Sequence, residues 1–186
     1  MAWSSIWTIG PPSRVRDHAV IRTAIWLAAS TAGALALASP ALAGDTASAV
    51  LRDATGKEAN GQPERSPGQP RPDIVSPGEH AFHIHAFGKC EPPDFKSAGP
   101  HFNPDQTRHG YLNPEGSHAG DMPNLHVPAD GKLQVEILVP NVSLSGEAPL
   151  LDAEGSALVI HAGADDYKTD PAGNSGDRIA CGVITP

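Results

Sequence analysis

The sequence predicts an all-β protein, built as a sandwich or a barrel. Short segments in which apolar and polar residues alternate recur along the chain, and a period of two residues is typical of half-buried strands. Glycine and proline, 19 of each among 186 residues, cluster between these segments as turn residues do. No segment sustains the period of 3.6 residues that an amphipathic helix requires.

The first 43 residues have the pattern of a secretory signal peptide. Three arginines precede an apolar stretch over residues 24–37, and the small residues 41–43 fit a cleavage site. We predict that residues 1–43 are removed and that the protein is exported to the periplasm. The alternative is a membrane anchor, but the apolar run is short for a spanning helix and Pro40 follows it. The long basic region also leaves open a translation start downstream of Met1.

The remaining chain, residues 44–186, has the size of one domain, 186 − 43 = 143 residues. Removing three Arg and one Asp changes the charged residues from 13 basic and 21 acidic to 10 and 20, a net charge of −10 with neutral His. So acidic a surface argues against nucleic acid as a partner. We expect no membrane attachment after cleavage, and the composition leaves open whether the protein is a monomer or a homodimer.

Two cysteines, Cys90 and Cys181, are the only ones in the chain. In an exported protein an isolated pair most often forms a disulfide. It would close a loop of about 90 residues, which stabilises the fold by roughly 4–5 kcal/mol in the chain-entropy model. The alternatives are a pair of free buried thiols and, less favoured, Cys90 as a metal ligand.

The N-terminal part of the predicted domain is irregular. Residues 47–52 alternate weakly and predict a strand, which a turn over residues 53–56 ends. Residues 60–77 contain five prolines and hardly any apolar residue other than Ile74 and Val75. Because proline cannot donate to a ladder, this segment is predicted to be an irregular linker and not a central strand.

Order returns after this segment. Residues 88–130 are rich in Gly, Pro, Asn and Asp and predict a long loop region, which a bound metal could hold in place. Four segments with apolar residues alternating or in a short run predict strands: residues 81–86, 132–139, 156–161 and 178–184.

Histidines are concentrated around the first of these strands. His83 and His85 are two residues apart on it, so both imidazoles leave the same face and could bind one metal. His161 ends a separate predicted strand and could complete this set from across the sheet. Imidazole nitrogens suit copper and zinc.

A second group of possible ligands lies on the long loop. Three imidazoles and one carboxylate would make a closed tetrahedral site suited to zinc, and they come from His101, His109, His118 and Asp121. Two further histidines fit neither group. We expect His80 to make structural hydrogen bonds beside the strand and His126 to face solvent.

Five segments together give a specific resemblance, namely GEHAFHIHAFGKC, GPHFNPDQTRHG, GSHAGDMPNL, IHAGADDY and GDRIACGVI. Over about residues 78 to 184 the chain resembles copper/zinc superoxide dismutases of the exported bacterial kind. The resemblance implies a Greek-key β-sandwich of the immunoglobulin-like kind with long metal-binding loops. It also implies copper and zinc as cofactors and superoxide as substrate, which copper redox cycling disproportionates to oxygen and hydrogen peroxide.

The resemblance assigns roles to individual residues. It implies copper bound by His83, His85, His101 and His161, and zinc bound by His101, His109, His118 and Asp121. His101 would then bridge both metals as an imidazolate and take part in proton transfer. Asp165 matches the aspartate that hydrogen-bonds a copper-side and a zinc-side histidine. Arg178 matches the arginine that receives the anionic substrate, and Cys90 and Cys181 match the family disulfide.

One part of the sequence departs from that pattern. The family has three alternating strands before the first histidines, and only residues 47–52 correspond to one of them. Residues 60–77 lack the alternation that the second and third strands need, either through a local reading-frame error or through an altered edge. We therefore expect an incomplete sandwich of reduced stability.

Two functions are compatible with these residues. The first is an enzyme, a superoxide dismutase; the second is a non-enzymatic protein that binds copper and zinc on the same fold. Arg178 favours the enzyme, because a protein that only binds metals has no need of an anion-binding arginine beside the copper ligands.

Overall fold

The computed structural model describes residues 19–23, 46–58, 75–131, 133–146 and 148–186. Their regular structure is almost entirely strand, with one short 3-10 helix, η1 (Lys96–Ala98). The predicted all-β architecture is therefore confirmed. No helix in this part of the chain is long and apolar enough to cross a membrane.

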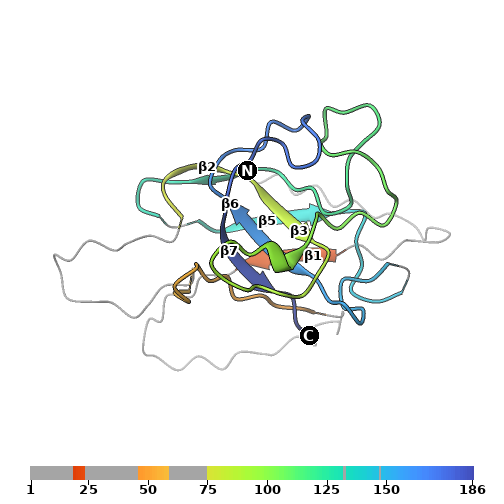
Figure 1. Ribbon diagram of the computed structural model, residues 1–186, viewed down its shortest axis with the longest axis horizontal. Coiled ribbons are helices and arrows are strands. Elements are labelled where there is room, and N and C mark those ends of the chain that lie inside the picture. The colour runs from red at the N-terminus through yellow and green to blue at the C-terminus, as the bar shows by residue number, and fades with distance from the viewer. Residues whose placement is uncertain (1–18, 24–45, 59–74, 132, 147) are drawn as a thin grey trace, which may run out of the picture.

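The central sheet consists of three antiparallel strands in the order β3-β6-β7 (Figure 1). They are β3 (Phe82–His85), β6 (Ala157–His161) and β7 (Arg178–Val183). Phe82 of β3 lies opposite Ile160 of β6. On the other side β6 pairs with β7, and the register shifts between Ile160 and His161. All five residues of β6 are buried, as expected for a central strand with both faces covered.

Two further antiparallel pairs complete the described strands. β2 (Gly78–His80) pairs with β4 (Leu125–Val127), and β1 (Ala19–Thr23) pairs with β5 (Val135–Val139). Figure 1 shows the β1–β5 pair running at an angle to the three-stranded sheet.

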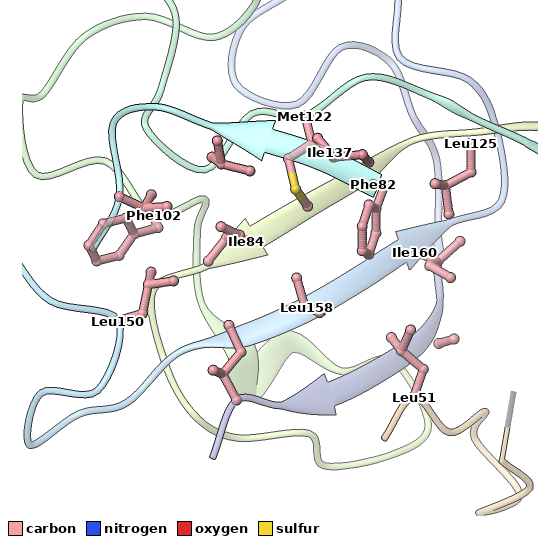
Figure 2. Packing of buried hydrophobic residues seen from close by; sticks show 14 of the residues in the cluster. Leu51, Phe82, Ile84, Phe102, Met122, Leu125, Ile137, Leu150, Leu158 and Ile160 are labelled. Carbon is pink, nitrogen blue, oxygen red and sulfur yellow. The ribbon is translucent and has the colours of Figure 1, made fainter. Parts of the chain in front are cut away.

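The main core lies on one face of the central sheet. Alternate strand residues point to the same face, so Phe82 and Ile84 of β3 join Leu158 of β6 in one apolar cluster. Figure 2 shows Ile137 of β5 and Met122 packing against them. β5 therefore covers this face from the other layer.

A smaller apolar cluster covers the opposite face, around Phe95, Ala157, Val159 and Cys181. His83 and His85 point to this second side, because they alternate with Phe82 and Ile84 along β3. The histidines thus leave a sheet that is packed on both faces, which makes their backbone positions rigid.

Three predicted strands are found with small shifts at their ends, and β3 covers the centre of the predicted segment 81–86. The prediction of a continuous strand over residues 47–52 is wrong. Ser48 and Arg52 form isolated bridges to Thr185 and Cys181, but no continuous strand. Leu51 is the only buried residue of the segment, so little packing holds a ladder together there.

The loop region 88–130 contains more regular structure than expected. β4 and η1 lie in it, each of only three residues. Elements of that length carry too few residues to show a period. β2 was also missed, for the same reason.

Most of the predicted signal peptide and of the proline-rich segment lies outside the described residues. Two parts are described. β1 falls within residues 1–43, and Val75 packs partly against the main core. The cleavage and the domain boundary at residue 44 stay predictions.

Candidate metal centre

Four buried histidines each turn one ring nitrogen to a common point. Within the described residues these nitrogens have no hydrogen-bond partner although they are buried: His83 Nδ1, His85 Nε2, His101 Nε2 and His161 Nε2. The four side chains offer ligand atoms that all lie within 4.8 Å of one another. A buried polar atom without a partner costs about 1–3 kcal/mol. Four such atoms in one place are explained if they bind a metal.

The second nitrogen of three of these rings is held by the protein. His85 Nδ1 donates to the carbonyl of Gly99 at 2.8 Å, and His161 Nδ1 donates to the carbonyl of Gly176 at 3.1 Å. His83 Nε2 donates to Asp165 Oδ2 at 2.8 Å. Because one nitrogen carries the proton in each hydrogen bond, the other is left as a lone-pair donor for a metal.

Burial keeps these rings neutral. It lowers the pKa of His85 to about 2, and those of His101 and His161 to about 4. The pKa of His83 is also lowered by burial, against the opposing effect of Asp165. Four neutral imidazoles fit a copper ion.

Asp121 is the centre of a second group of donors. Its Oδ1 lies 2.9 Å from His101 Nδ1, 3.0 Å from His109 Nδ1 and 3.3 Å from His118 Nδ1. His118 Nδ1 is also 3.3 Å from His101 Nδ1. Ligands about 2.0–2.1 Å from a tetrahedral zinc are separated by about 3.3 Å. The spacing of these four atoms therefore fits zinc.

The carboxylate of Asp121 is oriented by the backbone. Its Oδ2 accepts from the N–H groups of Gly110, at 2.9 Å, and His118, at 3.0 Å. Burial alone would raise the pKa of Asp121, but hydrogen bonds from three histidines outweigh it and hold the pKa well below its usual range. The group therefore stays an anion.

His101 belongs to both groups. Its Nδ1 lies toward Asp121, and its Nε2 is one of the four unpaired nitrogens described above, which are here called the copper-side nitrogens. His83 also offers a ligand atom within 4.8 Å of those of His101, His109 and Asp121, and the centre of its ring is 4.0 Å from that of His101. However, His83 Nε2 already donates to Asp165, and its Nδ1 is one of the four copper-side nitrogens. His118 is therefore the better fourth donor for zinc.

Asp165 links the two groups, as the sequence led us to expect. Its Oδ2 accepts from His83 and its Oδ1 accepts from His109 Nε2 at 2.9 Å. Burial lowers the pKa of His109, but Asp121 and Asp165 outweigh it and raise that pKa to about 9. Gly173 lies against this contact with φ +63°, and a Cβ there would come within 1.8 Å of Asp165 Oδ1. Glycine at this position is required on both grounds.

Arg178 lies beside the copper-side histidines, opposite His161 in the sheet. Its Nη1 donates to the carbonyl of Phe95 at 2.8 Å and its Nη2 donates to that of Gly99 at 2.7 Å. The Gly99 carbonyl also accepts from His85. One carbonyl therefore fixes the guanidinium relative to a metal-facing ring.

Cys90 and Cys181 form a disulfide, which confirms the predicted pairing. It ties the segment before η1 to β7, three residues beyond Arg178. The segment that carries the Phe95 and Gly99 carbonyls is therefore attached to the strand that carries the arginine.

The two remaining histidines also lie as expected. His80 is buried and donates from Nδ1 to the His161 carbonyl at 2.8 Å. The His126 side chain is 74% exposed and lies 3.3 Å from Glu79.

Sequence reasoning missed the residues that support the ligands. Gly99 and Phe95 act through backbone carbonyls, which no residue type indicates. Asn124 holds the backbone of Asp165 with two hydrogen bonds, and Tyr167 donates its N–H to Asp165 Oδ1. Their nearness in sequence to Asp121 and Asp165 was the only available signal.

The copper/zinc superoxide dismutase family profile matches residues 62–184 of this chain. The chain is 62% identical over 108 residues to a copper–zinc superoxide dismutase of Aquifex aeolicus, covering 57% of this chain and 64% of that protein. It is 51% identical over 114 residues to one of Caulobacter vibrioides, covering 59% and 66%. The aligned part thus spans less than two thirds of these relatives.

Solved structures agree with the sequence comparison. The crystal structure of a SOD-like protein from Bacillus subtilis superposes with a TM-score of 0.63 at 41% identity, covering 73% of this chain and 95% of that one. A double mutant of that protein gives a TM-score of 0.63 at 42% identity, covering 73% and 94%. The likeness confirms the predicted β-sandwich with long metal-binding loops.

Proposed function

The chain belongs to the copper/zinc superoxide dismutase family, and from this premise we propose that it disproportionates superoxide. Two superoxide anions and two protons yield one oxygen and one hydrogen peroxide. The observation that carries the proposal is the set of four buried imidazole nitrogens that have no hydrogen-bond partner among the described residues and lie beside an arginine. Copper would be held by His83, His85, His101 and His161, and zinc by His101, His109, His118 and Asp121.

Bound copper supplies one-electron redox chemistry, because it can accept an electron from one superoxide and return it to another. The chain's own residues supply the environment for that exchange. His83, His85 and His161 keep their metal-facing nitrogens unprotonated through hydrogen bonds at the other nitrogen. Zinc would fix the orientation of His101 together with Asp121.

Arg178 is the group that receives the substrate. Superoxide is a small anion, and a guanidinium attracts it electrostatically and can orient it by hydrogen bonds. Two carbonyls hold the guanidinium in place, and one of them also holds His85. The anion would therefore be bound next to the copper-side nitrogens.

His101 is the residue placed to carry a proton. Its Nε2 belongs to the copper-side group while its Nδ1 remains with Asp121. A proton taken up at Nε2 would lie beside the bound substrate, which needs protons to become peroxide.

The test is metal analysis together with a dismutation assay on the full chain, its Arg178→Ala variant and an Arg52→Ala control. We expect about one copper and one zinc per chain. Arg178→Ala should lower the rate at least about tenfold, since electrostatic attraction of a substrate contributes factors of about 10 to 1,000. Its metal content should be unchanged. The parent rate should fall with salt, because the Debye length is about 10 Å at 0.1 M.

Arg52 is a suitable control because its side chain is 53% exposed and paired with Glu58. Its removal makes the same change in net charge without touching the copper-side group. An unchanged rate for Arg178→Ala would mean that this arginine does not receive the substrate. A metal-loaded parent without activity would support the alternative, a protein that only binds copper and zinc.

We also propose export to the periplasm. The basic and apolar segments within residues 1–43 support a cleaved signal peptide. Protein recovered from the periplasm of a bacterial host should begin at Gly44, as N-terminal sequencing would determine. Recovery of the uncleaved chain from the cytoplasm alone would contradict this.

A further inference from the structure

Two tyrosines from different loops stack beside the metal centre. The rings of Tyr111 and Tyr167 have centroids 5.7 Å apart and planes inclined by 28°. Tyr111 lies on the loop between His109 and His118, and Tyr167 lies two residues after Asp165. The stack therefore joins a zinc-side loop to the loop that carries the aspartate shared by both histidine groups.

The backbone N–H, the backbone carbonyl and the side-chain hydroxyl of Tyr167 each form one hydrogen bond to a different residue. Its N–H donates to Asp165 Oδ1 at 2.6 Å. Its carbonyl accepts from the N–H of Leu112 at 2.9 Å. Its hydroxyl accepts from the N–H of Asn124 at 2.7 Å. One residue thus contacts three segments that surround the two histidine groups.

Asn124 extends this arrangement to the backbone of Asp165. Its Oδ1 accepts from the Asp165 N–H at 2.8 Å, and its Nδ2 donates to the Asp165 carbonyl at 3.0 Å. Asp165 is therefore held at its backbone by Asn124 and at its carboxylate by Tyr167. Its two oxygens can then face His83 and His109 at once.

Tyr111 attaches the other end of the stack to a zinc-side residue. Its hydroxyl donates to the backbone carbonyl of Asp121 at 2.6 Å. The neighbouring Gly110, with φ +98°, lies so close that a Cβ there would be 2.2 Å from the Tyr167 carbonyl. Gly110 and Tyr167 thus bring the two loops into close backbone contact.

The backbone of Tyr167 indicates that this arrangement is imposed on it. Its φ of 59° is in the left-handed region, which is uncommon for a residue other than glycine. Such a conformation persists when surrounding contacts over-determine it. The hydrogen bonds of its N–H, carbonyl and hydroxyl groups are contacts of that kind.

We propose that Tyr111 and Tyr167, here called the tyrosine clasp, are positioning residues that set the orientation of Asp165 and thereby hold the copper-side and zinc-side histidines in one arrangement. This rests on the metal sites of the proposed function. The hydrogen bonds of the clasp reach the Asp165 carboxylate, the Asn124 N–H and the Asp121 carbonyl, so it acts through Asp165 and the Asp121 backbone. Loss of the clasp should loosen metal retention before it loosens the fold.

The test measures cobalt(II) bound in place of zinc, since its visible absorption bands report the geometry of the site. The full chain is compared with Tyr111→Phe, Tyr167→Phe and the double variant. Each single variant removes one hydroxyl but keeps a ring. Leu112→Ala is the matched control, because this side chain is 67% exposed and its backbone bond to Tyr167 remains.

We expect each tyrosine variant to release cobalt to a chelator about five- to tenfold faster than the parent, the effect of losing one hydrogen bond. The cobalt bands should shift, and the double variant should differ from the product of the single effects. The control should match the parent. A role in fold stability alone would lower the melting temperature and leave the bands and the release rate of the folded variants unchanged, and that result would overturn the proposal.

Folding defects are also informative. Cobalt should refold any variant that is merely destabilised, by mass action, so a variant that is unfolded without metal is compared with the parent after cobalt has refolded it. Bands and a release rate equal to those of the parent would then contradict the proposal, and a shifted spectrum with faster release would support it. Because no arm uses superoxide, a chain that binds cobalt normally but does not dismutate would refute the proposed activity and leave the clasp standing.

Discussion

The three-stranded sheet with its loops and the β1–β5 pair are held together in different ways. The sheet is covered on both faces, and its loops are tied by a disulfide and by the hydrogen bonds of Asp121 and Asp165. β5 pairs along its full length with β1, which lies within the predicted signal peptide. The first region is therefore cross-linked by a disulfide and by buried polar bonds, while β5, which covers its main core, pairs with a segment that is also predicted to be cleaved.

The two regions also differ in what their buried residues do. Ile137 and Val139 of β5 are buried in the main core and contribute packing, while Leu138 between them is 64% exposed. The buried histidines of the sheet face the other way and contribute ligands. Damage on the β5 side should therefore lower stability, and damage on the histidine side should remove metal.

The largest expected effect is loss of copper from the histidine side. His161→Ala removes one of the four copper-side nitrogens and none of the zinc-side atoms. It should abolish dismutation while zinc content stays near one per chain, as metal analysis would determine. His126→Ala is the control, since that side chain is 74% exposed. Equal loss of zinc and copper would show that the two groups are not separate sites.

The next effect concerns the disulfide and the metal ligands that cross-link the first region. Reduction of Cys90–Cys181 removes a restraint worth roughly 4–5 kcal/mol, and whole domains are stable by only about 5–15 kcal/mol. Chelator and reductant together should therefore abolish the cooperative melting transition, while either alone should lower its midpoint. A high cooperative midpoint in the metal-free, reduced chain would show that the β5 side contributes more than we infer.

Removal of residues 1–43 should have a smaller effect, confined to the β5 side. β5 would lose its pairing with β1. Full exposure of one large apolar side chain costs about 1.5–3 kcal/mol, so partial exposure of such side chains on β5 should cost less than that for each. Urea unfolding of the 44–186 chain should detect this, and its metal content should equal that of the full chain. Loss of metal binding on truncation would contradict the independence of the two regions.

The smallest effect is a dependence of the stability of the metal-free protein on pH. It distinguishes histidines whose pKa is lowered by folding from His109, whose pKa is raised. Folding lowers the pKa of His85 to about 2 and those of His101 and His161 to about 4. Their contribution to the free energy of unfolding is fully present above their ordinary pKa of about 6.5 and is lost as the pH falls toward 4. Folding raises the pKa of His109 to about 9, so its contribution is present below pH 6.5 and is lost as pH rises to 9.

Urea unfolding of the metal-free chain should therefore show greatest stability near pH 6.5. His109→Gln should remove the decline on the alkaline side and keep the one on the acid side. A profile that is flat from pH 6.5 to 9 in the parent would mean that Asp121 and Asp165 do not hold a proton on His109.

Much of the site could be predicted because its chemistry depends on residue type and short spacing. His83 and His85 lie on the same face because side chains alternate along a strand with a period of two residues, and both residues are in β3. Imidazole and carboxylate side chains show their donor atoms in the sequence itself. The Cys90–Cys181 pair offered only one possible partner for each cysteine.

Other features were decided by tertiary structure. The carbonyls that fix Arg178 belong to Phe95 and Gly99, and carbonyls are common to all residues. Asn124 holds the backbone of Asp165 because two loops that are distant in sequence lie against each other in the folded chain. Likewise, no local pattern marked Ala19–Thr23 as the strand beside β5. Periodicity and residue type report only on near neighbours, whereas these contacts depend on which distant backbone groups the folded chain brings within hydrogen-bond reach.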